Sequence, residues 1–126
     1  MFCPFVELFS MRANAPAPAP PKPRIHPLAG SWYTVTKGSM LCNFGTGFID
    51  IAADGRSGHA DVGGFPGAVS LRYTAPDVYL TYGYVDSFGG DAIAVYDGTL
   101  SADKNTITGI LGGTWEDNCT FTMQRR

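Results

Sequence analysis

The sequence is poor in charge, and its few charges are not gathered in one place. Only 16% of the 126 residues are charged, and the formal net charge is −2. The nine basic residues are scattered, apart from the Arg125-Arg126 pair and Lys22 with Arg24. The chain therefore lacks the basic patch that is typical of a nucleic-acid-binding surface, and we expect no nucleic-acid partner.

Long apolar runs and metal-ligand spacings are also missing. No apolar run approaches the ~20 residues that a membrane-spanning helix needs, so no membrane span is expected. The three cysteines are Cys3, Cys42 and Cys119, and no two of them have the spacing of zinc ligands. No glycine-rich phosphate loop follows a strand and opens a helix. The sequence therefore predicts neither a metal nor a cofactor.

What the chain has instead is glycine and aromatic side chains. There are 16 glycines, and Phe, Trp and Tyr make up 13% of the residues. Together with the low charge, this composition suits an all-β protein with tight turns better than a helical one. The first 27 residues look unlike the rest. We therefore divide the chain into an N-terminal segment, residues 1–27, and one domain, residues 28–126.

The N-terminal segment leaves several interpretations open. Residues 1–12 have apolar side chains at helix-like spacing, and Ala13-Asn14-Ala15 resembles a signal-peptide cleavage site, but no basic region precedes it. A short amphipathic anchor and a start codon chosen upstream of Met11 are the alternatives. Residues 13–27 alternate alanine and proline, which predicts either a semi-rigid polyproline arm or a disordered linker. Such an arm would suit docking to a protein partner or to a second copy of the chain.

Short alternating segments separated by turn residues make up the remaining sequence. We predict strands at residues 31–37, 43–53, 56–63, 67–75, 77–86, 91–98, 105–112 and 118–125. Asp54-Gly55 predicts a two-residue hairpin turn, in which both central residues need positive φ. No helical segment interrupts the series. Strands at this spacing predict a β-sandwich or a β-barrel.

Pairing of the two end segments favours the barrel. Residues 31–37 and 118–125 both alternate between two faces, as strands do. An antiparallel register that places Trp32 opposite Arg125 would close the sheet on itself. The predicted fold is therefore an eight-stranded antiparallel up-and-down β-barrel with an extended, Pro/Ala-rich N-terminal arm.

The same register makes neighbours of two cysteines. Cys119 falls beside the end of the first strand, where a short turn leads to Cys42. A disulfide between them would favour an oxidising compartment, secreted or periplasmic. In a reducing compartment both residues would be buried thiols.

The first strand also resembles that of a known group of barrels. Gly30-Ser31-Trp32 is similar to the G-x-W entry of the lipocalin and avidin-like barrels, the calycin group. In those families a first-strand tryptophan packs at the closed end of the barrel, under an arginine or lysine from the last strand. The resemblance implies that Trp32 and Arg125 plug the closed end here. It covers the end strands and the strand count, without the helix of lipocalins or the biotin-binding polar residues of avidins.

An eight-stranded barrel has an interior that holds either side chains alone or one small ligand. Aromatic residues are expected to line it, and tyrosine hydroxyls among them would orient a small apolar molecule. The expected lining residues are Phe44, Phe48, Tyr73, Tyr82, Tyr84, Tyr96 and Trp115. The alternative is that these rings fill the interior completely.

One pair of side chains suggests a catalytic alternative. His59 and Asp61 are two residues apart on a predicted strand, so they share a face. A histidine held by a carboxylate is the minimal general-base unit, and on an inward face it would suit a cofactor-free barrel cyclase or isomerase. Three functions thus remain: a non-catalytic barrel that binds a small hydrophobic molecule, which we favour, an accessory subunit docked through residues 1–27, and this enzyme.

Overall fold

A computed structural model describes residues 25–38, 42 and 44–126 of the chain. These residues form eight strands and no helix, so none of their segments is a helix that would span a membrane. The strands are β1 (Gly30–Lys37), β2 (Thr46–Ile51), β3 (Ser57–Val62), β4 (Phe65–Thr74), β5 (Asp77–Val85), β6 (Asp91–Leu100), β7 (Thr106–Gly113) and β8 (Cys119–Arg125). All eight predicted strands are present, with ends that differ by a few residues.

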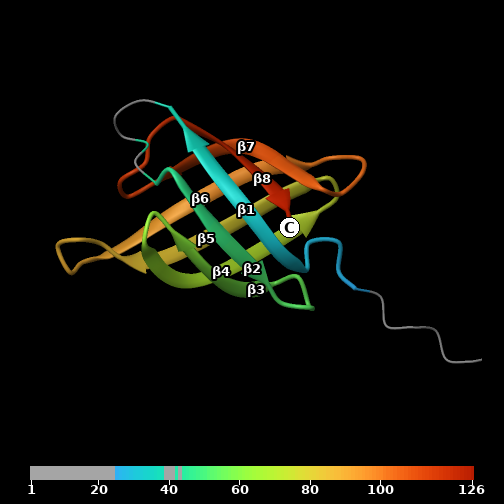
Figure 1. The fold of residues 1–126 in the computed structure, drawn as a ribbon, viewed down its shortest axis with the longest axis horizontal. Helices are drawn as coiled ribbons and strands as arrows, with labels where there is room; N and C mark the ends of the chain where they lie inside the picture. The colour runs from blue at the N-terminus through green and yellow to red at the C-terminus, as the bar shows by residue number, and fades with distance from the viewer. Residues whose placement is uncertain (1–24, 39–41, 43) are drawn as a thin grey trace, which may run out of the picture.

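The eight strands form one closed barrel in chain order, each antiparallel to the next (Figure 1). Closure comes from pairing of β1 with β8, in the predicted register: Trp32 lies opposite Arg125, and Thr34 opposite Met123. The predicted up-and-down barrel is thereby confirmed. Most of the predicted arm, residues 1–24, lies outside the described residues.

Alternation along the strands decides which side chains enter the barrel. In β5, Val78, Leu80, Tyr82 and Tyr84 are buried, while the residues between them face outward. The pleat of a strand sends successive side chains to opposite faces, so the apolar set of each strand meets those of the other strands inside. The resulting core is continuous through the barrel.

Two ends of the barrel can be distinguished by the loops that they carry. One end holds the N-terminal residues 25–29 and the loops after β2, β4 and β6. We call this the closed end. The opposite end, here the open end, holds the loops after β1, β3, β5 and β7 and lies on the left in Figure 1.

At the closed end, Trp32 is fully buried and forms the floor of the barrel. Its indole Nε1 donates a hydrogen bond to the Leu28 carbonyl at 2.9 Å. The Arg125 guanidinium carbon lies 4.3 Å from the centre of the indole ring, a cation–π contact. The plug implied by the resemblance is therefore present, and the barrel is compatible with a calycin-like architecture.

Arg125 also ties three backbone segments together at this end. Its Nη1 donates to the Ala29 carbonyl at 2.7 Å, and its Nη2 donates to the carbonyls of Pro27 and of Lys104, the latter at 3.0 Å. These bonds join the last strand to the N-terminal residues and to the loop after β6. They satisfy carbonyls that no strand ladder reaches.

The loop after β2 differs from the prediction. β2 ends at Ile51 and β3 begins at Ser57, so five residues make the connection in place of the predicted two, and the Ala52 N–H donates to the Ser57 carbonyl. Only Gly55 in this loop has a positive φ, +71°. The imidazole of His26 covers it, and a Cβ on Gly55 would lie 2.1 Å from His26 Nδ1. The predicted hairpin between β2 and β3 is present, but the two-residue turn was wrong, because Asp54 does not have the positive φ that such a turn needs.

A disulfide crosses the open end. The sulfurs of Cys42 and Cys119 are 1.90 Å apart and their Cα atoms 5.6 Å apart, across 77 positions of sequence. The prediction that these cysteines are neighbours is confirmed, and the pair fits an oxidising compartment. Gly38 lies against it, because a Cβ there would come within 2.5 Å of the Cys42 sulfur.

Candidate ligand-binding site at the open end

Side chains fill the centre of the barrel. Trp32, Tyr82 and Tyr96 are the largest fully buried side chains. The ring of Tyr96 meets that of Phe121 edge-on, with centroids 5.0 Å apart. Of the expected lining residues, Tyr82 and Tyr96 thus belong to the packed core, as the alternative of a filled interior predicts for them.

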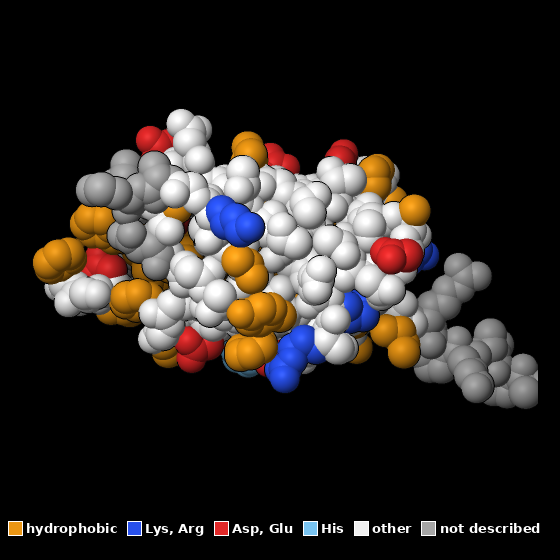
Figure 2. Space-filling view, turned by 45° about the horizontal axis from the view of Figure 1, so that its top comes forward, with side chains coloured by type: hydrophobic (Ala, Val, Ile, Leu, Met, Phe, Trp, Pro, Cys, Tyr) orange, Lys and Arg blue, Asp and Glu red, His pale blue; other side chains and the backbone are white. Residues whose placement is uncertain are grey.

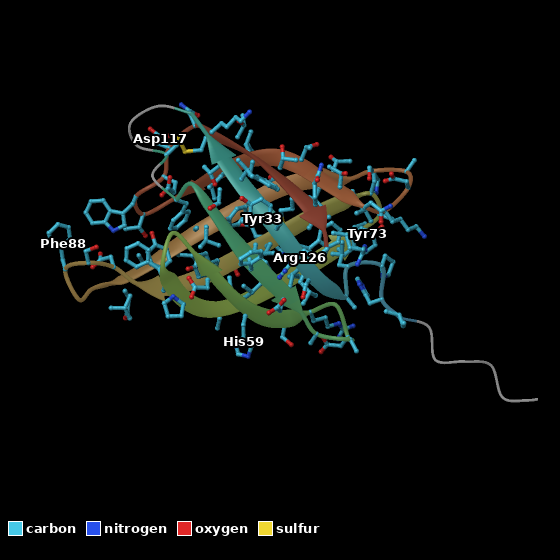
Figure 3. All side chains as sticks on the ribbon, viewed as in Figure 1. Tyr33, His59, Tyr73, Phe88, Asp117 and Arg126 are labelled. Carbon is cyan, nitrogen blue, oxygen red and sulfur yellow. A yellow bond between two sulfur atoms is a disulfide. The ribbon has the colours of Figure 1, made fainter. Side chains whose placement is uncertain are left out.

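A pocket of about 340 Å³ lies at the open end. Its volume falls within the range of small-molecule sites, which begins at ~300 Å³. The lining residues that the structure describes come from the open-end loops and the strand ends beside them: Phe44, Phe65, Tyr84, Asp86, Ser87, Phe88, Trp115 and Glu116. In the side-chain view, this is the end labelled by Phe88 and Asp117 (Figure 3).

The base of the pocket is made of buried rings. Tyr84 is buried at the end of β5, and its ring centroid lies 5.2 Å from that of Phe44 and 5.4 Å from that of Phe65. Tyr82 lies just below, 5.1 Å from Tyr84. Because these rings contact one another and the core, the base exists before any ligand arrives.

Two rings that are more exposed than those of the base form the rim of the pocket. Phe88, in the loop after β5, is 85% exposed, and Trp115, in the loop after β7, is 46% exposed. Their centroids are 5.8 Å apart. Large apolar side chains so exposed on a small protein mark candidate binding surfaces. Figure 2 shows hydrophobic side chains gathered with acidic ones at this left-hand end of the molecule.

Asp86 holds the rim in place. Its Oδ1 accepts hydrogen bonds from the backbone N–H groups of Phe88 and Gly90, both at 2.9 Å, and its Oδ2 accepts one from Trp115 Nε1 at 3.0 Å. These bonds, of which the one from Gly90 contributes most, lower the pKa of the Asp86 carboxyl below its ordinary value. The carboxylate therefore stays charged at neutral pH and links the two rim loops.

Glu116 contributes a second carboxyl group, from inside the wall of the pocket. It is only 3% exposed, and its Oε2 lies 3.5 Å from the Cys119 sulfur. Among the described residues, Cys42, Glu116 and Cys119 form the one trio whose ligand atoms are close enough to hold a metal ion. The two sulfurs are bonded to each other, so they are not available as the thiolates that a metal would need.

The tyrosines near the pocket respond to burial and to this negative charge. Burial raises the pKa of Tyr84, and the charges of Glu116 and Asp86 raise it further. Burial also raises the pKa of Tyr82 to about 12. Burial raises the pKa of Tyr96 as well, and among the described residues its hydroxyl has no hydrogen-bond partner.

Two of the expected lining residues lie elsewhere. Phe48 points outward from β2, is 43% exposed and packs between Tyr33 and Arg126, so it does not line the interior. Tyr73 is half-buried at the closed end, where its ring meets that of His26 at 5.5 Å. Their roles in binding remain predictions, and neither residue lines the open-end pocket.

His59 and Asp61 share a face of β3, as predicted, but that face is the outer one. Both side chains are exposed, and Figure 3 shows His59 on the outside of the barrel. The condition that the cyclase or isomerase hypothesis set, an inward-pointing pair, is not met. Nearby, the Ser31 hydroxyl donates to Asp50 at 2.5 Å, and Asp50 lies opposite His59 in the sheet.

The sequence-based site missed pocket residues that lie in the open-end loops or, in the case of Phe65, at the start of a strand. Phe65, Asp86, Phe88 and Glu116 all line the pocket, yet no strand pattern singles them out. One signal in the sequence does point to them: in an up-and-down barrel, alternate loops lie at the same end. The order of the predicted strands is therefore enough to group the loops after β3, β5 and β7.

Comparisons with known proteins do not assign a family. A scan against models of protein families finds no match, and a search of curated proteins finds no similar sequence. The calycin-like resemblance consequently stands on the barrel architecture and the plug alone. The function has to be argued from the open-end pocket.

Proposed function

We propose that this protein is a non-catalytic β-barrel that binds one small, largely apolar molecule at its open end. The observation that carries the proposal is the 340 Å³ pocket, whose base and rim are aromatic rings. Rings give a ligand large apolar contact at low cost in side-chain entropy, and transfer of apolar surface from water drives binding.

The shape of the protein supports this use. The closed end is plugged and the centre is packed, which leaves the open end as the entrance and the binding place together. Its base is held by ring contacts, and Asp86 ties both rim loops by hydrogen bonds. A site with so little freedom to lose needs little ordering when a ligand binds.

We propose a secreted or periplasmic location for this barrel. The Cys42–Cys119 pair supports it, since disulfides persist in oxidising compartments. The second function, an accessory subunit docked through residues 1–27, depends on a segment of which only residues 25–27 are described, and it remains a prediction. Deletion of residues 1–27 should then abolish association and leave the barrel folded; unchanged association would reject it.

Binding can be measured with N-phenyl-1-naphthylamine, a neutral apolar dye whose fluorescence rises when it leaves water. We expect saturable binding to the full chain, and at least a tenfold loss of affinity in Trp115→Ala, equivalent to ~1.4 kcal/mol. Tyr33→Ala is the matched control, because Tyr33 is a similarly exposed ring on the outer wall of β1. Absence of saturable binding, or equal losses in both variants, would overturn the proposal.

A further inference from the structure

We infer that the ligand of the open-end pocket is a small organic cation, with a positively charged nitrogen carried on an apolar body. The inference rests on the proposed function and goes beyond it, because it names the charge of the ligand.

The charged residues among the described pocket lining are all acidic. Asp86 and Glu116 both line the pocket, and none of its described lining residues is basic. Asp86 lies at the rim and Glu116 in the wall, so the carboxyl groups belong to loops that meet across the entrance: the loop after β5 and the loop after β7. An entering molecule passes both.

Aromatic faces attract the same sign of charge. Five of the described lining residues carry rings: Phe44, Phe65, Tyr84, Phe88 and Trp115. The face of an aromatic ring carries partial negative charge, and a cation within about 6 Å of it is attracted, most strongly over tryptophan. Aromatic pockets with an acidic group are how proteins hold alkylammonium ions, whose methyl groups also need apolar contact.

The described basic side chains of the barrel lie away from this pocket. Arg125 is over Trp32 at the closed end, Arg126 over Phe48 and Arg72 over Tyr79 on the outer wall. Lys37 belongs to the outward-facing set of β1. The described basic residues are Lys37, Arg56, Arg72, Lys104, Arg125 and Arg126, and none lines the pocket. An anionic ligand would therefore find no counter-charge among the described lining residues.

The direction of the pKa shift of Tyr84 agrees with the acidic character of the lining. Burial raises the pKa of Tyr84, at the base, and the charges of Glu116 and Asp86 raise it further. A negative potential that disfavours a phenolate at the base favours a cation in the same place.

The first test uses the full chain and a pair of ligands with one shape. Choline carries a trimethylammonium group, and 3,3-dimethyl-1-butanol is its uncharged carbon counterpart. We expect choline to displace N-phenyl-1-naphthylamine with at least tenfold higher affinity than the alcohol. Raising the salt concentration from about 20 to 500 mM should weaken choline and leave the alcohol unchanged, because ions screen charge.

The second test uses Glu116→Gln, which removes the charge and keeps the shape. Asp117→Asn is the matched control, since Asp117 is exposed on the same loop and does not line the pocket. We expect Glu116→Gln to weaken choline at least tenfold with dye affinity unchanged, and Asp117→Asn to change neither. If Glu116→Gln fails to fold, the inference is tested on the unaltered chain by the comparison of choline with 3,3-dimethyl-1-butanol and by the salt dependence of the two.

The outcomes separate the two ideas. Dye binding that depends on Trp115, with choline no better than the alcohol, would leave the proposed function standing and overturn the cation. Equal weakening of dye and choline by Glu116→Gln would also overturn the cation, since the effect would then be one of shape. Failure of both the dye and choline to bind would overturn the proposed function together with the inference.

Discussion

The two ends of this barrel are built from the same eight strands, and each carries a tryptophan, an ionised side chain and loop backbone. At the closed end these parts contact one another: Trp32 is buried, and Arg125 covers it while bonding to loop carbonyls. At the open end Trp115 and Asp86 are bonded to each other at the rim, and a pocket lies beside them. The comparison teaches that the same residue types can either seal the end of a barrel or leave a pocket there. The outcome depends on whether the charged side chain finds loop backbone groups to bond while it covers the tryptophan.

The largest expected difference between the ends concerns the tryptophans. Trp32→Ala should lower the free energy of unfolding by about 3–5 kcal/mol, because it removes a fully buried side chain and leaves a cavity at the floor of the barrel. Trp115→Ala, at a half-exposed site, should lower it by less than about 1 kcal/mol. Urea denaturation of both variants checks this. Equal losses would show that the rim is as structural as the floor.

At the open end, the disulfide should contribute more to stability than Trp115 does. Replacing both Cys42 and Cys119 by alanine should cost about 2–4 kcal/mol, since the cross-link spans 77 positions and restricts the unfolded chain. The same double variant should weaken dye binding, because the loop that carries Glu116 precedes Cys119 directly. Denaturation and dye titration would test the two effects separately. Full retention of both stability and binding would contradict the role given to the disulfide.

The next largest expected effect is the loss of stability when the Arg125 guanidinium is removed from the closed end. Arg125→Ala should cost about 2 kcal/mol, through loss of the cation–π contact and of the hydrogen bonds to the carbonyls of Pro27, Ala29 and Lys104. Arg126→Ala is the neighbouring control, and we expect a loss below about 0.5 kcal/mol, because the Phe48 ring that it covers is exposed. A similar cost for both arginines, measured by thermal unfolding, would refute the plug.

The smallest expected effect is a pH dependence of stability that comes from the buried tyrosines between the two ends. In the folded protein the pKa of Tyr82 is raised from 10.0 to about 12. Between these values the unfolded chain loses a proton that the folded protein keeps, so stability is full below pH 10 and falls as the pH rises. The slope should be at most about 1.4 kcal/mol per pH unit for this residue.

Urea denaturation at several pH values above 9 measures that slope. Tyr82→Phe should make it shallower without abolishing it, because burial raises the pKa of Tyr96 in the same direction. A Tyr82→Phe variant with the slope of the unaltered chain would show that Tyr82 ionises equally easily in both states.

Most of the fold follows from local sequence. Alternation marked all eight strands, and pairing of the first with the last placed Trp32 opposite Arg125 and Cys119 beside Cys42, as the structure has them. These predictions succeed because a strand has a period of two, and an antiparallel meander pairs neighbours in sequence order. The predicted two-residue turn at Asp54-Gly55 was wrong, because only Gly55 of the two residues has a positive φ; His26, distant in sequence, packs on this loop.

The candidate site was only partly predictable. That aromatic rings line the site follows from composition, and Tyr84, Phe44 and Trp115 are among those expected. Which rings remain accessible does not follow, because alternation assigns a face but not a depth: Tyr82 and Tyr84 share a face, and only the second reaches the pocket.

The sequence by itself determined the strands, their order and the closing register, since each depends on residue type at short range or on a single long-range pairing. The plug at Trp32 and Arg125 was expected only from the resemblance to calycin barrels. Only the tertiary structure decided that the centre is full and that Glu116 and Asp86 meet the rings at one end. Those features depend on barrel tilt and on the packing of loops from four separate connections. No local pattern encodes that packing, because it is the sum of contacts among distant residues.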